Sequence, residues 1–81
     1  MDSRLQKRYS SSAVIKLLTA RYGLNMLGIK KILGIGTSRY KKLLNGAENL
    51  NDNEAKIIDE TFTELKGRYY YEAIKRVEND N

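Results

Sequence analysis

The side chains of this chain that could do chemistry gather in one short stretch, residues 37–45. Four of them are hydroxyl or ammonium groups on the outer face of a predicted helix: Thr37, Ser38, Lys41 and Lys42. Side chains of this length, on a helix that lies in a major groove, can reach base edges or phosphate oxygens. These residue types are suited to binding a ligand through hydrogen bonds and positive charge.

Residue types that serve enzymes and metal sites are missing or unsupported. The chain has no cysteine and no histidine, so it lacks thiolate ligands, the commonest metal ligand and the commonest general base. Adjacent carboxylates such as Asp59 and Glu60 are ordinary solvated residues of a predicted helix. Residues 34–38 superficially resemble a phosphate-binding loop, but they lack its lysine and glycine spacing, and no strand precedes them. We expect no catalytic residue, no metal, no cofactor and no small-molecule ligand.

The distribution of charge is the strongest feature of the composition. The 81 residues include 15 Lys or Arg and 10 Asp or Glu, a net charge of +5. Residues 3–47 contain ten basic residues and no acidic one, whereas residues 48–81 contain nine acidic and five basic residues. A solvated surface ordinarily mixes both signs, so a polyanionic partner explains the acid-free segment. The alternative is a chance excess on a lysine-rich surface.

Two short helices joined by a glycine turn are expected to position the polar side chains. Asn25 can cap the first helix, and Gly34 can end it in the left-handed conformation. The second helix begins at Thr37 and closes at Gly46. The apolar residues of both helices recur at helical spacing and define their inner faces: Ile29, Ile32, Leu33, Tyr40, Leu43 and Leu44. Such a pair is a helix-turn-helix.

The same stretch resembles the phage Cro/repressor-type (XRE-like) helix-turn-helix family. The resemblance is carried by a Gly-Leu-polar start at residues 23–25 and by later positions whose spacing from Asn25 to Gly46 matches without a gap: Ile29, Leu33, Gly34, Ile35, Tyr40, Leu43 and Gly46. It implies a DNA-binding protein in which the base-facing positions are held by Thr37, Ser38 and Lys42. It also implies that the backbone near Asn45 lies close to a phosphate.

Two residues depart from the family pattern. Met26 stands where a glutamine that touches phosphate is common. Lys30 stands where the family usually places alanine, which lets the two helices cross closely. Lys30 must extend out of the crossing, or the crossing is wider, or the register is shifted.

Phosphate contacts are expected from both helices. Arg39 and Lys41 flank the base-facing surface, and Lys30 and Lys31 lie on the preceding helix near the backbone that it crosses. Such contacts supply affinity, whereas the few base-facing side chains supply limited specificity. We therefore expect a homodimer that reads two half-sites about 34 Å apart, or a multiple of that distance.

The C-terminal segment carries an apolar stripe that predicts one helix over residues 52–78, with an open question whether it continues through Gly67. At 1.5 Å per residue this helix would be about 40 Å long, more than a small domain can cover. We expect its stripe to be the dimer interface, formed by Ile58, Phe62, Leu65, Tyr69, Tyr70, Ala73, Ile74 and Val77. Three consecutive tyrosines, residues 69–71, could instead stack single-stranded bases, but tyrosines on an acidic helix more often pack in an interface.

The whole chain is expected to be one all-α domain in which three short helices are followed by the long one. The first of these helices covers residues 13–22. We divide the chain into a basic N-terminal arm (residues 1–10), a helix-turn-helix segment (residues 11–50) and an acidic, tyrosine-rich dimerisation element (residues 51–81). The arm is either a tail or a segment that orders on a phosphate backbone or in a minor groove.

The expected function is sequence-specific binding of double-stranded DNA by a dimer, as a transcriptional regulator such as a repressor of a phage or mobile element. One alternative is an architectural or DNA-processing accessory protein, such as a plasmid or excision factor. Another is a protein-protein interaction module that uses the same fold. The chain has no long apolar run and no apolar signal-peptide core, so we expect a cytoplasmic protein without membrane contact.

Overall fold

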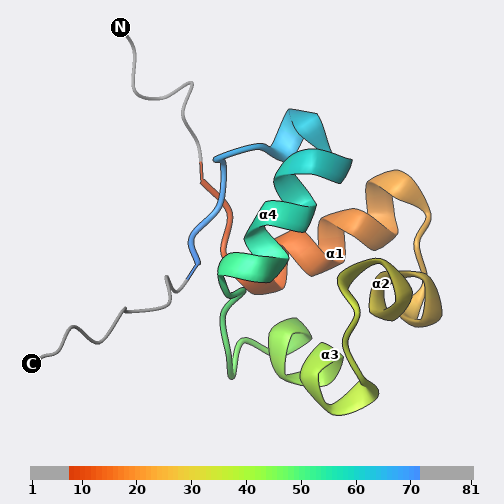
Figure 1. Ribbon diagram of the computed structural model, residues 1–81. Coiled ribbons are helices and arrows are strands. Elements are labelled where there is room, and N and C mark those ends of the chain that lie inside the picture. The colour runs from red at the N-terminus through yellow and green to blue at the C-terminus, as the bar shows by residue number, and fades with distance from the viewer. Residues whose placement is uncertain (1–7, 72–81) are drawn as a thin grey trace, which may run out of the picture.

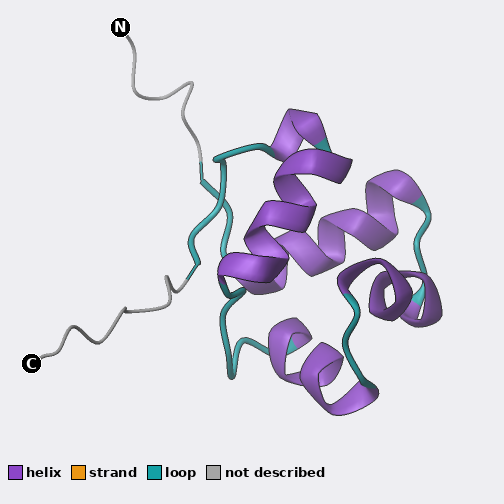
Figure 2. Cartoon of the chain, viewed as in Figure 1, coloured by secondary structure: helices purple, strands orange, loops and turns teal. Residues whose placement is uncertain are grey.

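Four α-helices follow one another in the computed structural model, which describes residues 8–71 (Figure 1). They are α1 (Ser11–Tyr22), α2 (Met26–Leu33), α3 (Thr37–Leu44) and α4 (Asp52–Thr61), and a short 3-10 helix, η2 (Thr63–Leu65), comes next. Helices and loops account for all of residues 8–71, without a strand (Figure 2). The predicted all-α class is confirmed. None of these helices is long and apolar enough to cross a membrane.

Side-chain caps fix where three of the helices begin. Ser10 accepts a hydrogen bond from a first-turn amide of α1 at 3.0 Å, and Asn25 does the same for α2 at 2.9 Å. At α4, Asn51 and Glu54 form a capping box, each side chain accepting from the other's backbone amide. Only α3 among the four begins without a side-chain cap, at Gly36. The predicted cap at Asn25 is confirmed.

Glycines in the left-handed conformation end α1 and α2. Gly23 has a φ of 70° and Gly34 a φ of 68°. A side chain at either position would be strained, because L residues rarely adopt a positive φ. The turn after Gly34 is short, so α3 starts at residue 37 and is held close to α2, as the glycine pattern predicts.

The core is built from the inner faces of the helices, from one residue between α3 and α4, and from three residues beyond α4. Its buried apolar members are Val14, Ile15, Leu18, Ile29, Leu33, Tyr40, Leu43, Leu50, Ala55, Ile58, Phe62, Leu65 and Tyr69. The inner faces predicted for the two helices of residues 25–46 do face inward, although Ile32 and Leu44 are only half-buried at the edge of the core, as are Leu17 and Tyr22 of α1. Ile15 and Leu50 were not predicted, yet both are fully buried.

The predicted continuous helix over residues 52–78 is wrong in its described part. Helix α4 ends at Thr61, and Phe62 already leaves the helical conformation with a φ of −121° and a ψ of 74°. The chain then turns through η2 and through Gly67, whose φ is 69°. An apolar residue at every third or fourth position suits a helix, but it equally suits tight turns that return each side chain to the same core. Residues 72–78 lie outside the described residues.

This return corrects the predicted dimer interface. Four of its residues, Ile58, Phe62, Leu65 and Tyr69, are at most 7% exposed within a single chain. Burying them in the chain's own core removes apolar surface from water without a partner. Tyr70 is exposed, and the remaining predicted interface residues, Ala73, Ile74 and Val77, lie outside the described residues.

Tyr69 anchors the returning segment. Its hydroxyl oxygen lies 2.7 Å from the carbonyl oxygen of Ala55 and 2.6 Å from the carboxylate of Asp59, and its single proton can be donated to one of them at a time. The backbone of Tyr9 pairs with this segment through hydrogen bonds of 2.8 and 2.9 Å. The two ends of the described chain therefore lie side by side (Figure 1), and Tyr9, predicted to belong to the arm, is part of the fold.

The stability of the fold should depend on Tyr69 at high pH. Burial, together with the hydrogen bond to Asp59, raises the pKa of Tyr69 above its usual value. The unfolded chain then loses the phenol proton at a lower pH than the folded chain does. The stabilisation by this phenol is therefore complete below about pH 10 and is lost as the pH rises further. Urea unfolding at pH 8 to 11 should show a steeper loss in the wild type than in Tyr69→Phe.

Tyr71→Phe is the matched control, because Tyr71 is 45% exposed. This variant should lose stability with pH as the wild type does. Equal pH dependence of the wild type and Tyr69→Phe would contradict the assigned role of Tyr69.

Candidate nucleic-acid interface

Helix α3 presents a polar outer face because its apolar residues pack into the core. Tyr40 and Leu43 are buried. The residues predicted to point outward are exposed, and they form the outer face of α3: Thr37, Ser38, Lys41 and Lys42. The structure thus brings the three predicted base-contacting residues, Thr37, Ser38 and Lys42, onto one helix surface.

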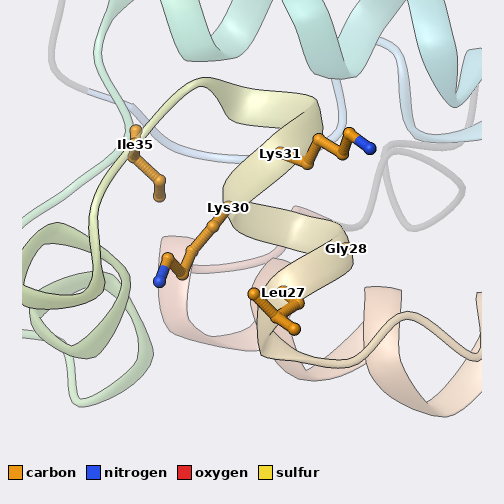
Figure 3. Close-up of a pocket in the computed structure, with 5 residues that line it drawn as sticks. All are labelled: Leu27, Gly28, Lys30, Lys31 and Ile35. Atoms are coloured by element: carbon orange, nitrogen blue, oxygen red, sulfur yellow. The ribbon is translucent and has the colours of Figure 1, made fainter.

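Helix α2 carries two lysines, and one of them reaches this face. Lys30, the residue that breaks the family pattern, is half-buried, and its Nζ donates to the Thr37 hydroxyl oxygen at 2.6 Å. The Lys30 side chain therefore reaches the start of α3. Lys31 is exposed and leaves α2 in a different direction (Figure 3).

A shallow hollow lies next to these lysines (Figure 3). Its lining combines apolar side chains with two ammonium groups and consists of Leu27, Gly28, Lys30, Lys31 and Ile35. Leu27 is 68% exposed, the most of any large apolar residue between residues 8 and 71. The surface of α2 beside α3 is therefore basic and partly apolar.

The lysines of this surface are largely unneutralised. No carboxylate of residues 8–71 lies within 4 Å of Lys30, Lys31 or Lys41. Lys42 is the exception, with its Nζ 3.6 Å from the Glu48 carboxylate. Ammonium groups gathered on two adjacent helices without counter-charges attract anions and repel one another.

Arg39 is not part of this surface, which corrects its predicted role as a phosphate contact. Its guanidinium group makes two hydrogen bonds to the Glu54 carboxylate, of 3.0 and 2.7 Å, and others to Glu48 and to the Asn49 carbonyl. Glu54 is 2% exposed, and a buried carboxylate requires a counter-charge of this kind. The hydrogen bond to Glu54 raises the pKa of Arg39, so the guanidinium group remains charged.

Glu48 and Glu54 were missed as residues that shape this site. Glu48 bonds Arg39 and also approaches Lys42, and the hydrogen bond from Arg39 lowers its pKa, so it is ionised at neutral pH. The sequence feature that could have indicated Glu48 is its position, since it is the first acidic residue after the acid-free segment. It places one negative charge at the border of the basic surface.

Asn45 closes the turn after α3. Its side-chain oxygen accepts from the Ala47 amide at 2.9 Å, and the backbone amides of residues 45–48 all donate within the turn. The backbone amides of this turn therefore already have acceptors within the chain. The side-chain NH2 group of Asn45 remains as the donor that could reach a phosphate.

No protein-family model matches this chain, and neither a curated protein nor a solved structure matches it. Within residues 8–71, no group of three or more His, Cys, Asp or Glu side chains is arranged to hold a metal ion.

Replacing Arg39 should test whether it stabilises the fold. Arg39→Ala leaves the Glu54 carboxylate buried without its counter-charge, so the free energy of unfolding should fall by about 3 kcal/mol or more. Arg21→Ala is the matched control, because Arg21 pairs with Glu64 where both side chains are more than half exposed. That variant should lose less than about 1 kcal/mol. Equal losses in urea unfolding would show that Arg39 is an ordinary surface cation.

Proposed function

We propose that this protein binds double-stranded DNA, with α3 in the major groove and α2 against the phosphate backbone. The observation that carries the proposal is the outer surface of these two helices. Lys30 of α2 donates to Thr37 on the polar face of α3, Lys31 of α2 is exposed, and no carboxylate of residues 8–71 lies within 4 Å of either lysine. Duplex DNA supplies both the dense negative charge and the grooves that such a surface fits.

The connection between the two helices supports a helix-turn-helix arrangement. Each helix has eight residues, and the turn between them is held by Gly34 in the left-handed conformation. Helices α1 and α4 pack behind the pair, so that α3 is supported on its inner face (Figure 1). A helix held in this way can enter a groove while the neighbouring helix crosses the backbone.

We assign different tasks to the residues of this surface. Base edges are read by Thr37, Ser38 and Lys42. Phosphates are bound by Lys30, Lys31, Lys41 and the side chain of Asn45. Phosphate contacts supply most of the affinity and are independent of sequence, whereas base contacts supply the preference. We propose no catalytic role for any of these residues.

The proposal includes two copies of the chain on two half-sites, because a few base-reading side chains give limited sequence information. Among the described residues predicted for the dimer contact, Tyr70 alone is exposed, at 58%. The proposed biological role is transcriptional regulation in a phage or mobile element.

A protein-protein interaction module is the second candidate. The exposed Leu27 and the hollow beside Lys30 and Lys31 favour it, since apolar area flanked by charge is common in protein contacts. A partner bound in this way would show little dependence on salt.

The salt dependence of duplex binding tests the proposal. The three lysines assigned to phosphates, Lys30, Lys31 and Lys41, should give a slope of log K against log salt of about −2.7 per chain. The duplexes should first be selected from a random pool, which also reveals the symmetry of the site. Lys41→Ala should make the slope shallower by about one, whereas Lys66→Ala, an exposed lysine outside α2 and α3, should leave it unchanged. A slope near zero would contradict DNA as the partner.

Glu48 should oppose DNA binding. Its carboxylate lies beside Lys42 and would face the negative charge of the duplex. Glu48→Gln keeps the shape of the side chain and removes that charge, so affinity at about 0.1 M salt should rise about threefold, and less at higher salt. Glu60→Gln, on the exposed face of α4, is the control and should have no effect. A weaker Glu48→Gln complex, with an unchanged melting temperature, would show that Glu48 contributes to binding.

A further inference from the structure

Lys30 is the residue through which α2 reaches the polar face of α3. Its Nζ lies 2.6 Å from the Thr37 hydroxyl oxygen, seven residues along the chain. An ammonium group has three donors and no acceptor, so Lys30 donates and the hydroxyl oxygen accepts. This hydrogen bond gives the ammonium group of Lys30 a partner on α3.

The hydrogen bond changes what the two residues can offer to a ligand. Thr37 still has its own O–H proton, and Lys30 has two further N–H groups. The pair therefore presents several donors and one positive charge, whereas Thr37 alone would present a neutral group that can donate or accept. The matching ligand is a pair of adjacent acceptors. In the major groove this describes N7 and O6 of guanine, while adenine places a donor, N6, beside its N7.

The surroundings leave the ammonium group available. No carboxylate of residues 8–71 lies within 4 Å of it. The side chain borders the hollow lined by Leu27, Gly28, Lys31 and Ile35, and it points away from Lys31 (Figure 3). Thr37 itself is exposed.

We infer that Lys30 is a specificity-determining residue that, held by Thr37, reads the N7 and O6 acceptors of one guanine per half-site. This inference depends on the proposed function, because it names the base that the same surface reads. Under this inference Lys30 contacts a base, and it no longer counts among the residues that bind phosphates. Phosphate oxygens have the same acceptor chemistry, so the test must separate the two sources.

The test uses the full chain and the duplex selected from a random pool. Each guanine is replaced in turn by 7-deazaguanine, which lacks the N7 acceptor. At one guanine per half-site the replacement should weaken wild-type binding at least about fivefold. It should not weaken the binding of Lys30→Met further, because that variant has already lost the contact. Thr37→Val should show a reduced sensitivity at the same guanine.

Lys31→Met is the matched control, since Lys31 is the neighbouring lysine of the same helix, is exposed and points elsewhere. It should weaken all duplexes about equally and keep the wild-type sensitivity to 7-deazaguanine. Thermal melts of all three variants should match the wild type, which excludes a folding defect as the cause of any change.

Three results would overturn the inference. The first is a selected half-site without guanine. The second is equal sensitivity of the wild type and Lys30→Met at every guanine. The third is a Lys30→Met variant that weakens every duplex equally and makes the salt slope shallower by about one, which assigns Lys30 to a phosphate. A wild-type protein that binds no duplex would instead overturn the proposed function, and this inference with it.

Discussion

The buried carboxylate of Glu54 determines how α3 is held. It accepts a hydrogen bond from the Asn51 amide at 2.9 Å, which begins α4, and two from the Arg39 guanidinium group at 2.7 and 3.0 Å. One side chain thus caps α4 and also binds an arginine of the preceding helix, α3. Because a buried carboxylate is costly without such partners, the positions of α3 and α4 are coupled. The outer face of α3 is what remains after Arg39, Tyr40 and Leu43 have been directed inward.

The arrangement also explains how the fold uses its uneven charge. The second half of the chain supplies carboxylates to two arginines of the first half: Glu64 pairs with Arg21, and Glu48 and Glu54 pair with Arg39. An arginine suits this task because its planar group binds a carboxylate through two parallel hydrogen bonds. The lysines of α2 and the Lys41 side chain are left without such partners among residues 8–71. Internal pairing therefore neutralises two arginines of the basic segment and leaves the lysines of α2 and Lys41 of α3 as positive charges on the surface.

Features that depend on neighbouring residues could be predicted from the sequence. The cap at Asn25, the helix end at Gly34 and the inward position of Tyr40 and Leu43 all follow from side chains within one or two turns. The exposed polar face of α3 follows from the same periodicity. The outward orientation of the side chains on the candidate surface can therefore be predicted from residues close to them in the sequence.

Features that depend on distant partners could not be predicted in this way. Arg39 has the same type and spacing as a surface cation, and only the approach of Glu54, fifteen residues later, turns it inward. The apolar residues after α4 fit a long helix, but Tyr69 returns to Ala55 and Asp59 and is joined by Tyr9. The sequence pattern shows that such residues are buried, but it does not show which residues they pack against.

Mapping the contact surface in solution tests the central claim most directly. Backbone amide signals should be recorded by NMR while the full chain is titrated with a duplex selected from a random pool. The claim that α2 and α3 contact DNA predicts large shifts for residues 27–48 and small ones for the returning segment around Tyr69 and Tyr70. Shifts centred on that segment, or none at all at saturating duplex, would contradict it.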